Sequence, residues 1–367
     1  LGMMLGNVLL LDLYNTLGLP TSTTVSMVFG LLGAAVATAL FRIAADPSFS
    51  LHDLSQFINT GKAMVIIAAI LVSVVFAFAA GTLFMYISRL IFSFRYHPAF
   101  RRWGAFWCGI SLSGILYFAL FKGLKSSGLI PSDITQYVGE HVLLTLFAFW
   151  AAASLILWIL QRMRFNIMRI TILSGTFALA LVFAGNDLVN FIGVPVAGFD
   201  AYSIAHRTGD ASMLMGALNE NVPANFLVLL AAGGVMIATL WTSKKSMHVS
   251  ATELSLSTQS DEGSEQQYGS SFFSRTIVRA ALNINAGVER VIPRRLRTAI
   301  AKRFEYEDIE HSGAPYDMIR ATVNLTTSAL LIAMATSLKL PLSTTYVSFM
   351  VAMGSSLADR AWGRETA

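Results

Sequence analysis

The sequence predicts an all-α, polytopic transmembrane protein with inverted repeats and broken helices. Three observations lead to this prediction. The 367 residues are 55% hydrophobic and only 13% charged, whereas soluble domains carry about 25% charged residues. Long stretches without a charged residue recur along the chain, and one octapeptide frame occurs twice. A soluble protein of this length would need a charged surface, so we expect much of this surface to face lipid.

Nine apolar segments are candidates for membrane helices. A helix needs about 20 apolar residues to cross the bilayer core, and backbone groups in lipid must be paired within the segment. Windows such as 63–88 and 221–243 contain no Asp, Glu, Lys or Arg. We therefore predict helices near 1–17, 21–41, 63–90, 103–121, 141–161, 170–190, 222–242, 316–339 and 343–358.

The connecting loops alternate in basic character. Arg and Lys are frequent at 95–102, at 162–169 and in the long loop 243–315, and they are sparse in the loops between these. Because cytoplasmic loops carry an excess of Lys and Arg, the three basic loops are predicted to be cytoplasmic. The same loops explain the net charge of +5, so we expect a lipid bilayer and no nucleic acid as partner.

Four regions follow from these segments. Residues 1–161 are predicted to form a first transmembrane half, truncated at its N-terminus, and 162–242 the start of a second half. Residues 313–367 complete the second half. Between them lies a polar insert, 243–312, in which 272–304 has the pattern of a basic amphipathic helix pair; we expect a cytoplasmic linker, with a regulatory or lipid-contacting module as the alternative. We expect the chain to be a fragment of a longer protein.

An octapeptide frame is repeated with a constant offset. Leu-Gly-Leu-Pro-Thr-Ser-Thr-Thr ends at Thr24, and Leu-Lys-Leu-Pro-Leu-Ser-Thr-Thr ends at Thr345, an offset of 345 − 24 = 321 residues. The same offset relates Gly33 to Gly354. An odd number of predicted crossings separates the copies, so the helices that follow them are predicted to run in opposite directions. Inverted repeats are typical of secondary transporters.

Each copy of the frame ends in three consecutive hydroxyl residues at the start of a predicted helix. Ser and Thr are favoured N-caps, and a helix N-terminus presents unpaired N–H groups with a positive partial charge. Such an end suits an anion, phosphate above all. Simple helix capping after a proline turn is the alternative. The residues are Ser22, Thr23, Thr24, Ser343, Thr344 and Thr345.

A second polar motif interrupts the segment 170–190. Gly185 is followed by Asn186, Asp187 and, one turn later, Asn190. An ionisable residue in a membrane segment is costly and usually functional. Glycine and asparagine suit an unwound helix break, where carbonyl and carboxylate oxygens could hold a hard cation. An Asp that caps a helix end in water is the alternative.

Motifs of other function classes are absent from the sequence. It contains no Walker loop, nucleophile elbow or zinc motif, and Cys108 is its single cysteine. We therefore expect neither an enzyme nor an ATP-driven pump. We also expect no protein-bound metal and no cofactor other than a coupling ion.

Together the motifs resemble the signatures of the inorganic phosphate transporter family. Gly-Asn-Asp-Leu-Val-Asn-Phe-Ile-Gly at 185–193 resembles its Gly-Ala-Asn-Asp-x-x-Asn signature, and the two proline-led triplets resemble its second signature. The resemblance implies two inverted repeats, each with one Asn-Asp and one Ser-Thr-Thr signature. It further implies that the six triplet residues contact phosphate and that Asn186, Asp187 and Asn190 serve the coupling cation.

Three departures from the family pattern stand out. The first Asn-Asp signature is absent and would fall before Leu1. Val25 and Tyr346 stand where members commonly have His after Ser-Thr-Thr, which leaves the coupling ion open. The polar insert also comes later in the chain than in familiar members.

We therefore predict cation-coupled symport of inorganic phosphate, with Na⁺ or H⁺ as the coupling ion. The expected location is the plasma (inner) membrane of a bacterium, and a homo-oligomer is an expected assembly. Two alternatives stay open. One is transport of a related oxyanion such as sulfate, and the other is a nontransporting membrane receptor or assembly subunit.

Overall fold

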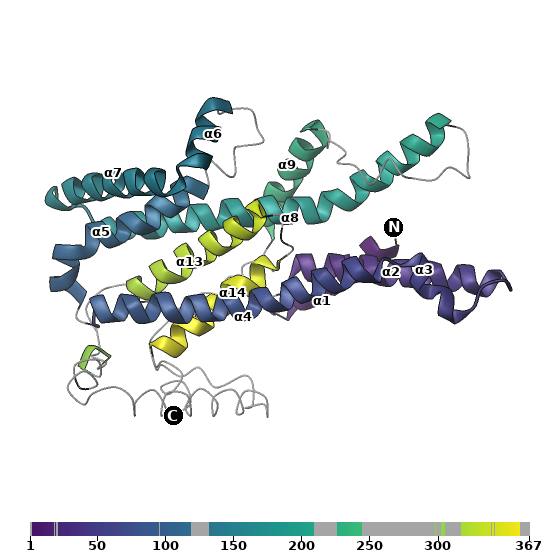
Figure 1. The fold of residues 1–367 in the computed structure, drawn as a ribbon, viewed down its shortest axis with the longest axis horizontal. Helices are drawn as coiled ribbons and strands as arrows, with labels where there is room; N and C mark the ends of the chain where they lie inside the picture. Colours follow the sequence, from purple (N-terminus) through teal and green to yellow (C-terminus); the bar gives the residue numbers. More distant parts are fainter. Residues whose placement is uncertain are drawn as a thin grey trace.

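In the computed structural model, all regular secondary structure of the described residues is helical, and these residues contain no strand (Figure 1). This confirms the predicted all-α class. The described residues are 2–17, 19, 21–94, 96–118, 132–208, 226–243, 298, 302–304, 317–338, 340 and 342–359. Most of the insert 243–312, including nearly all of the predicted helix pair 272–304, lies outside them.

Nine helices in the described residues correspond one by one to the nine predicted segments. Shorter elements lie between them: a 3₁₀ helix at Leu51–Asp53, α3 (Leu54–Phe57) and α6 (Ser132–Glu140). The nine are α1 (Gly2–Thr16), α2 (Thr23–Ala45), α4 (Thr60–Ile91), α5 (Tyr96–Leu116), α7 (Val142–Arg162), α8 (Ile167–Thr208), α9 (Phe226–Thr242), α13 (Met318–Ser337) and α14 (Thr344–Ala358).

Five helices in the described residues are long and apolar enough to cross a membrane, which makes the chain an integral membrane protein. They lie in α2, α4, α7, α8 and α13. By contrast, α1 and α14 have 15 residues each. A helix of that length reaches about 22 Å, less than the roughly 30 Å of the hydrocarbon core. The nine predicted segments are therefore not nine full crossings.

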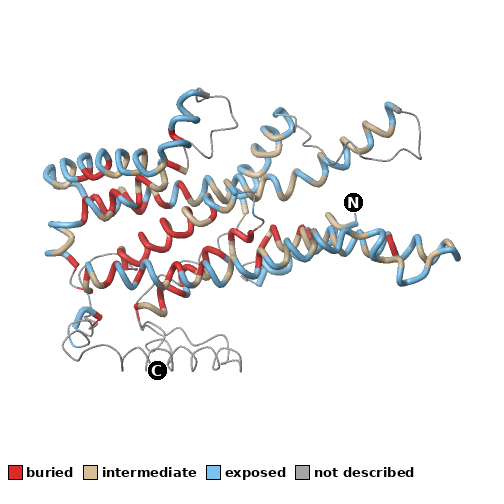
Figure 2. The backbone as a smooth tube through the Cα atoms, in the orientation of Figure 1, coloured by how far each residue is buried: buried red, intermediate tan, exposed pale blue. Residues whose placement is uncertain are grey.

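The outer helices expose their apolar side chains, as expected for contact with lipid. Leu143 of α7 is 84% exposed and Trp241 of α9 is 88% exposed. The buried residues gather instead on α13, α14 and the parts of α4, α5 and α8 that pack around them (Figure 2). In a bilayer this distribution is reasonable, because lipid tails solvate apolar side chains as well as a protein core does.

The least apolar of the five helices that could cross a membrane, α13, lies at the centre. In α13, Thr322, Asn324, Thr326, Thr327 and Ser328 are all buried. The hydroxyl groups of Thr322 and Thr326 donate to the carbonyl groups four residues earlier, at 2.7 Å. These bonds satisfy the two hydroxyl groups within the helix, whereas neither polar atom of the Asn324 side chain has a hydrogen-bond partner among the described residues.

Two helical hairpins enter from opposite ends of the molecule and meet near its middle (Figure 1). In the first, α1 and α2 are antiparallel neighbours, joined by the Asn7 amide, which donates to Met27 Sδ at 3.0 Å. In the second, α13 and α14 are joined at their far ends by Arg320 and Asp359, 2.9 Å apart. Each hairpin turns at one copy of the repeated frame.

Each of the two turns contains an equivalent backbone hydrogen bond. Leu19 N donates to Tyr14 O at 3.0 Å, and Leu340 N donates to Ala335 O at 3.0 Å. The donors and the acceptors are each related by the offset of 321 residues (340 − 19 and 335 − 14). The sequence repeat is therefore also a repeat of local structure.

Glycine allows α4 and α14 to touch. A Cβ atom added at Gly354 would lie 2.2 Å from Phe78 O, and one added at Gly81 would lie 2.3 Å from Val351 O. Any side chain at either position would therefore meet the backbone of the other helix. Small residues allow close approach between membrane helices in this way, and α14 is docked firmly on α4.

The predicted unwound break at 185–190 is wrong. Helix α8 is continuous over its 42 residues and even contains Pro195. The polar side chains of this stretch find partners on neighbouring helices, and the Asn186 amide donates to Val182 O at 3.0 Å within α8. With its side chains satisfied in this way, the backbone has no need to open.

Candidate functional site

The two serines of the triplets cap their helices in the same way. Ser22 (φ −92°, ψ 114°) begins α2 and accepts from Val25 N, while Ser343 (φ −94°, ψ 114°) begins α14 and accepts from Tyr346 N. These bonds measure 3.1 and 3.0 Å. Both serines are buried, at 4% and 0% exposure. The first N–H groups of a helix have no partner inside it, so each cap leaves further donors at a positively polarised end.

The tips of the two hairpins touch. Thr345 Oγ1 donates to the backbone carbonyl of Thr21 at 3.1 Å. The starts of α2 and α14 therefore lie together inside the protein, although 321 residues separate their caps (343 − 22). Two such helix starts can direct N–H and hydroxyl donors at one anion.

The Asn-Asp motif of α8 lies against the first triplet. Thr23 Oγ1 donates to Asp187 Oδ1 at 2.7 Å, and Asn190 Nδ2 donates to Thr24 Oγ1 at 2.8 Å. A carboxylate thus lies directly beside the start of α2. Asp187 is partly buried, so its charge is screened less than at a fully exposed position.

The same motif reaches the second hairpin through Asn186. Its Nδ2 atom lies 3.4 Å from Thr336 Oγ1, near the end of α13. Because Asn186 and Asn190 both use Nδ2 as the donor, each has its Oδ1 atom left to coordinate a cation. Helix α8 thereby connects both hairpins.

All nine predicted site residues belong to this one region. Eight of them have a hydrogen bond that ties a helix start or joins two elements, and Thr344, which is buried, is the first residue of α14 between Ser343 and Thr345. The chemistry assembled here consists of hydroxyl and N–H donors, amide oxygens and one carboxylate. Such a set can hold an anion and a hard cation side by side.

Two further contributors were not predicted. Thr21 takes part through its carbonyl oxygen, which residue type does not reveal, and Thr336 takes part from the end of α13. The only sequence signal for Thr336 is a hydroxyl residue near the end of an apolar segment, which is common. Sequence alone could not single it out.

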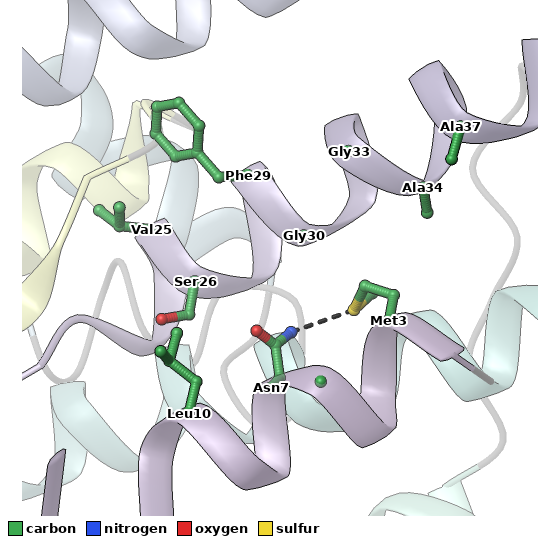
Figure 3. A pocket seen from close by; sticks show the side chains of 11 residues that line it. Met3, Asn7, Leu10, Val25, Ser26, Phe29, Gly30, Gly33, Ala34 and Ala37 are labelled. Atoms are coloured by element: carbon green, nitrogen blue, oxygen red, sulfur yellow. Dashed lines mark hydrogen bonds between the residues drawn. The ribbon is translucent and has the colours of Figure 1, made fainter. Parts of the chain in front are cut away.

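A separate hollow of about 620 Å³ opens between α1 and α2 (Figure 3). Its lining is largely apolar, with Asn7 and Ser26 as its polar side chains. The Asn7 amide donates to Met3 Sδ and Met27 Sδ, both at 3.0 Å. Because this amide is already bound to sulfur, the hollow is a poor place for an anion, and the hairpin tips remain the candidate site.

The fold and the site define a polytopic helical membrane protein in which two hydroxyl-rich helix starts and a carboxylate lie together. A family model described as "Phosphate transporter family" matches residues 1–274. The chain belongs to this family. The match includes the first triplet and the Asn-Asp motif, while the second triplet lies beyond it. No curated protein and no solved structure matches the chain.

Proposed function

We propose that this protein carries inorganic phosphate across a membrane together with a cation, by symport. One observation carries the proposal: the starts of α2 and α14 meet at the Thr345–Thr21 contact, and Asp187 lies beside them. The family match supports phosphate as the substrate. A bacterial plasma membrane and a homo-oligomeric assembly remain parts of the proposal.

Phosphate suits the donors at the two helix starts. The hydroxyl groups of Ser22, Thr24 and Ser343 accept hydrogen bonds in this structure, so their protons remain free to donate to an anion. They lie in a buried setting, where hydrogen bonds to an anion are strong. A protonated phosphate oxygen can also donate a hydrogen bond to Asp187, which sulfate at neutral pH cannot do. This difference favours phosphate over sulfate.

The carboxylate provides the reason for coupling. Asp187 and phosphate are both negative, so they repel each other at close range in a low-dielectric interior. A cation bound by the Asp187 carboxylate, with the Oδ1 atoms of Asn186 and Asn190, removes this repulsion. Oxygen ligands of this kind suit Na⁺ or H⁺. The cation thus raises the affinity for phosphate, and phosphate raises the affinity for the cation by the same factor.

Alternating access follows from the opposed hairpins. The α1–α2 hairpin reaches the site from one end of the molecule and the α13–α14 hairpin from the other (Figure 1). Movement of one hairpin relative to the other would open the site toward one side at a time. This is how transporters built of repeats work in general.

The test is uptake of labelled phosphate into proteoliposomes under a Na⁺ gradient or a proton gradient. We expect uptake that needs one of the gradients, resists excess sulfate and falls at least tenfold in Asp187→Asn. Asp200→Asn, further along α8, is the matched control and should keep normal uptake. Uptake by Asp187→Asn equal to that of the control would overturn the coupling role, and absence of uptake by the unaltered chain would overturn the function.

A further inference from the structure

Four charged side chains are buried together at the end of α13 and α14 that lies away from the candidate site. Arg89, Arg320 and Asp359 are 0% exposed, and Asp317 is 8% exposed. They come from the end of α4, the start of α13 and the residue that ends α14. The loops that adjoin this end are those predicted to be cytoplasmic.

Among the described residues, these four groups form one network with two positive and two negative charges. Arg89 bridges the two carboxylates: Nε donates to Asp359 Oδ1 at 2.5 Å, and Nη2 donates to Asp359 Oδ2 at 2.8 Å and to Asp317 Oδ2. Arg320 donates to Asp359 Oδ2 from Nε at 3.1 Å and from Nη2 at 2.9 Å. We call Arg89, Asp317, Arg320 and Asp359 the charge clamp.

The clamp joins three helices in one place. Asp317 also caps α13 by accepting from Ile319 N and Arg320 N, at 2.7 and 3.0 Å. The Arg89 guanidinium lies over the Phe94 ring, 4.1 Å from its centre, a favourable cation–π arrangement. Ends of α4, α13 and α14 are thereby held together in a fixed register.

A contribution to folding stability does not by itself explain these four buried charges. The desolvation penalty of buried charges often exceeds their attraction, and apolar replacements of a buried ion pair are often neutral or stabilising. Here the Nη1 atoms of Arg89 and Arg320 also have no hydrogen-bond partner among the described residues. A role in setting a specific position accounts better for the clamp.

The element positioned by the clamp is the second triplet. Helix α14 lies between its cap Ser343 and the clamp residue Asp359, and its 15 residues make a rod of about 22 Å. Gly354 and Gly81 dock the C-terminal half of this rod on α4, and Ala77 of α4 packs with Val347 and Val351 one turn earlier. A shift at the clamp would therefore be passed to Ser343, Thr344 and Thr345 at the other end.

We propose that the four clamp residues are positioning residues for transport: they lock α4, α13 and α14 into one rigid body that carries the second triplet. The proposal rests on the proposed function, because it assigns a role in phosphate binding. In this account the clamp stays closed throughout the transport cycle. A gate built from the same four charges would instead open in each cycle.

Replacement of the four residues tests the positioning role. The fourfold variant Arg89→Met, Asp317→Asn, Arg320→Met and Asp359→Leu removes these four charges and keeps a cap on α13. We expect a folded protein whose KM for phosphate rises at least tenfold, because the apolar side chains pack without fixing the register of the three helices. The single variant Asp359→Asn leaves buried charge uncompensated, and its KM should rise at least tenfold. Ser348→Ala, which removes a buried hydroxyl from α14, is the control and should change neither value.

A covalent link tests the rigid body without touching the charges. Ala77 of α4 and Val351 of α14 pack in one apolar cluster, and the single native cysteine can be removed as Cys108→Ala. In that background, Ala77→Cys and Val351→Cys should be joined by a short bifunctional reagent with uptake kept within threefold.

Loss of uptake on cross-linking would overturn the clamp, and so would an unchanged KM in the fourfold variant or in Asp359→Asn. If the fourfold variant does not fold, Asp359→Asn and the cross-link decide. If the unaltered chain itself takes up no phosphate, the proposed function fails, and the clamp fails with it for that separate reason.

Discussion

Thr345 donates a hydrogen bond to the backbone carbonyl of Thr21 across 324 residues of sequence, at 3.1 Å. This contact joins the tips of the two hairpins. Each hairpin turn contains an equivalent backbone hydrogen bond. The candidate site therefore lies at the boundary between two similar units rather than inside either one. A site at such a boundary changes whenever the units move, which is what alternating access requires.

The equal geometry of Ser22 and Ser343 predicts equal effects of their removal. Ser22→Ala and Ser343→Ala should each destabilise a helix start by about 1 kcal/mol. Each should also raise the KM for phosphate roughly tenfold, because a hydrogen bond to a charged group contributes about 1.5–3 kcal/mol. Kinetics of labelled phosphate uptake measure this effect.

Ser26→Ala is the control for these variants, since Ser26 lies one turn further along α2 and faces the apolar hollow. Its KM should stay unchanged. If both cap variants keep the KM of this control, the serines are helix caps only and do not contact phosphate.

The contact between Thr23 and Asp187 predicts that Thr23→Val and Thr23→Ser differ in the cation dependence of phosphate uptake. Thr23→Val keeps the shape of the side chain but removes the donor to Asp187 Oδ1, so it should alter the dependence of uptake on cation concentration at least threefold. Thr23→Ser keeps the donor and should behave like the unaltered protein. Identical cation curves for the Val and Ser variants would show that this hydrogen bond does not influence the cation.

Repeat-related glycines provide a matched pair for packing. Gly354→Ala would place a methyl group against the Phe78 carbonyl, whereas a Cβ atom at Gly33 meets nothing within 4 Å. Overpacking of this kind typically destabilises by about 1–3 kcal/mol. We expect Gly354→Ala to lower the thermal unfolding temperature in detergent and Gly33→Ala to leave it nearly unchanged. Equal unfolding temperatures would contradict the close packing of α4 and α14.

Local features of this protein could be predicted from its sequence. The helices that begin at Thr23 and Thr344 follow from a proline and a capping serine, because these signals act within a few residues. The apolar segments follow from composition, and the offset between Ser22 and Ser343 follows from direct comparison of the two frames.

Features that depend on neighbours could not be predicted. The predicted break at Gly185–Asn190 failed because local composition does not show that Thr24 and Thr336 would satisfy the side chains. The charge clamp was missed for a similar reason. Arg89 and Asp359 lie at segment ends, where charged residues usually face water, and only the fold brings them together.

Cross-linking across the Thr345–Thr21 contact tests whether the two hairpin tips form one phosphate site. The protein would carry Cys108→Ala, Thr21→Cys and Thr345→Cys, with Thr38→Cys in place of Thr21→Cys as a control. Thr38 lies about 22 Å along α2 from its start. We predict rapid oxidative cross-linking of the tip pair, slowed by phosphate but not by sulfate, and none for the control. Absence of a tip cross-link, or a rate that phosphate does not change, would contradict the account.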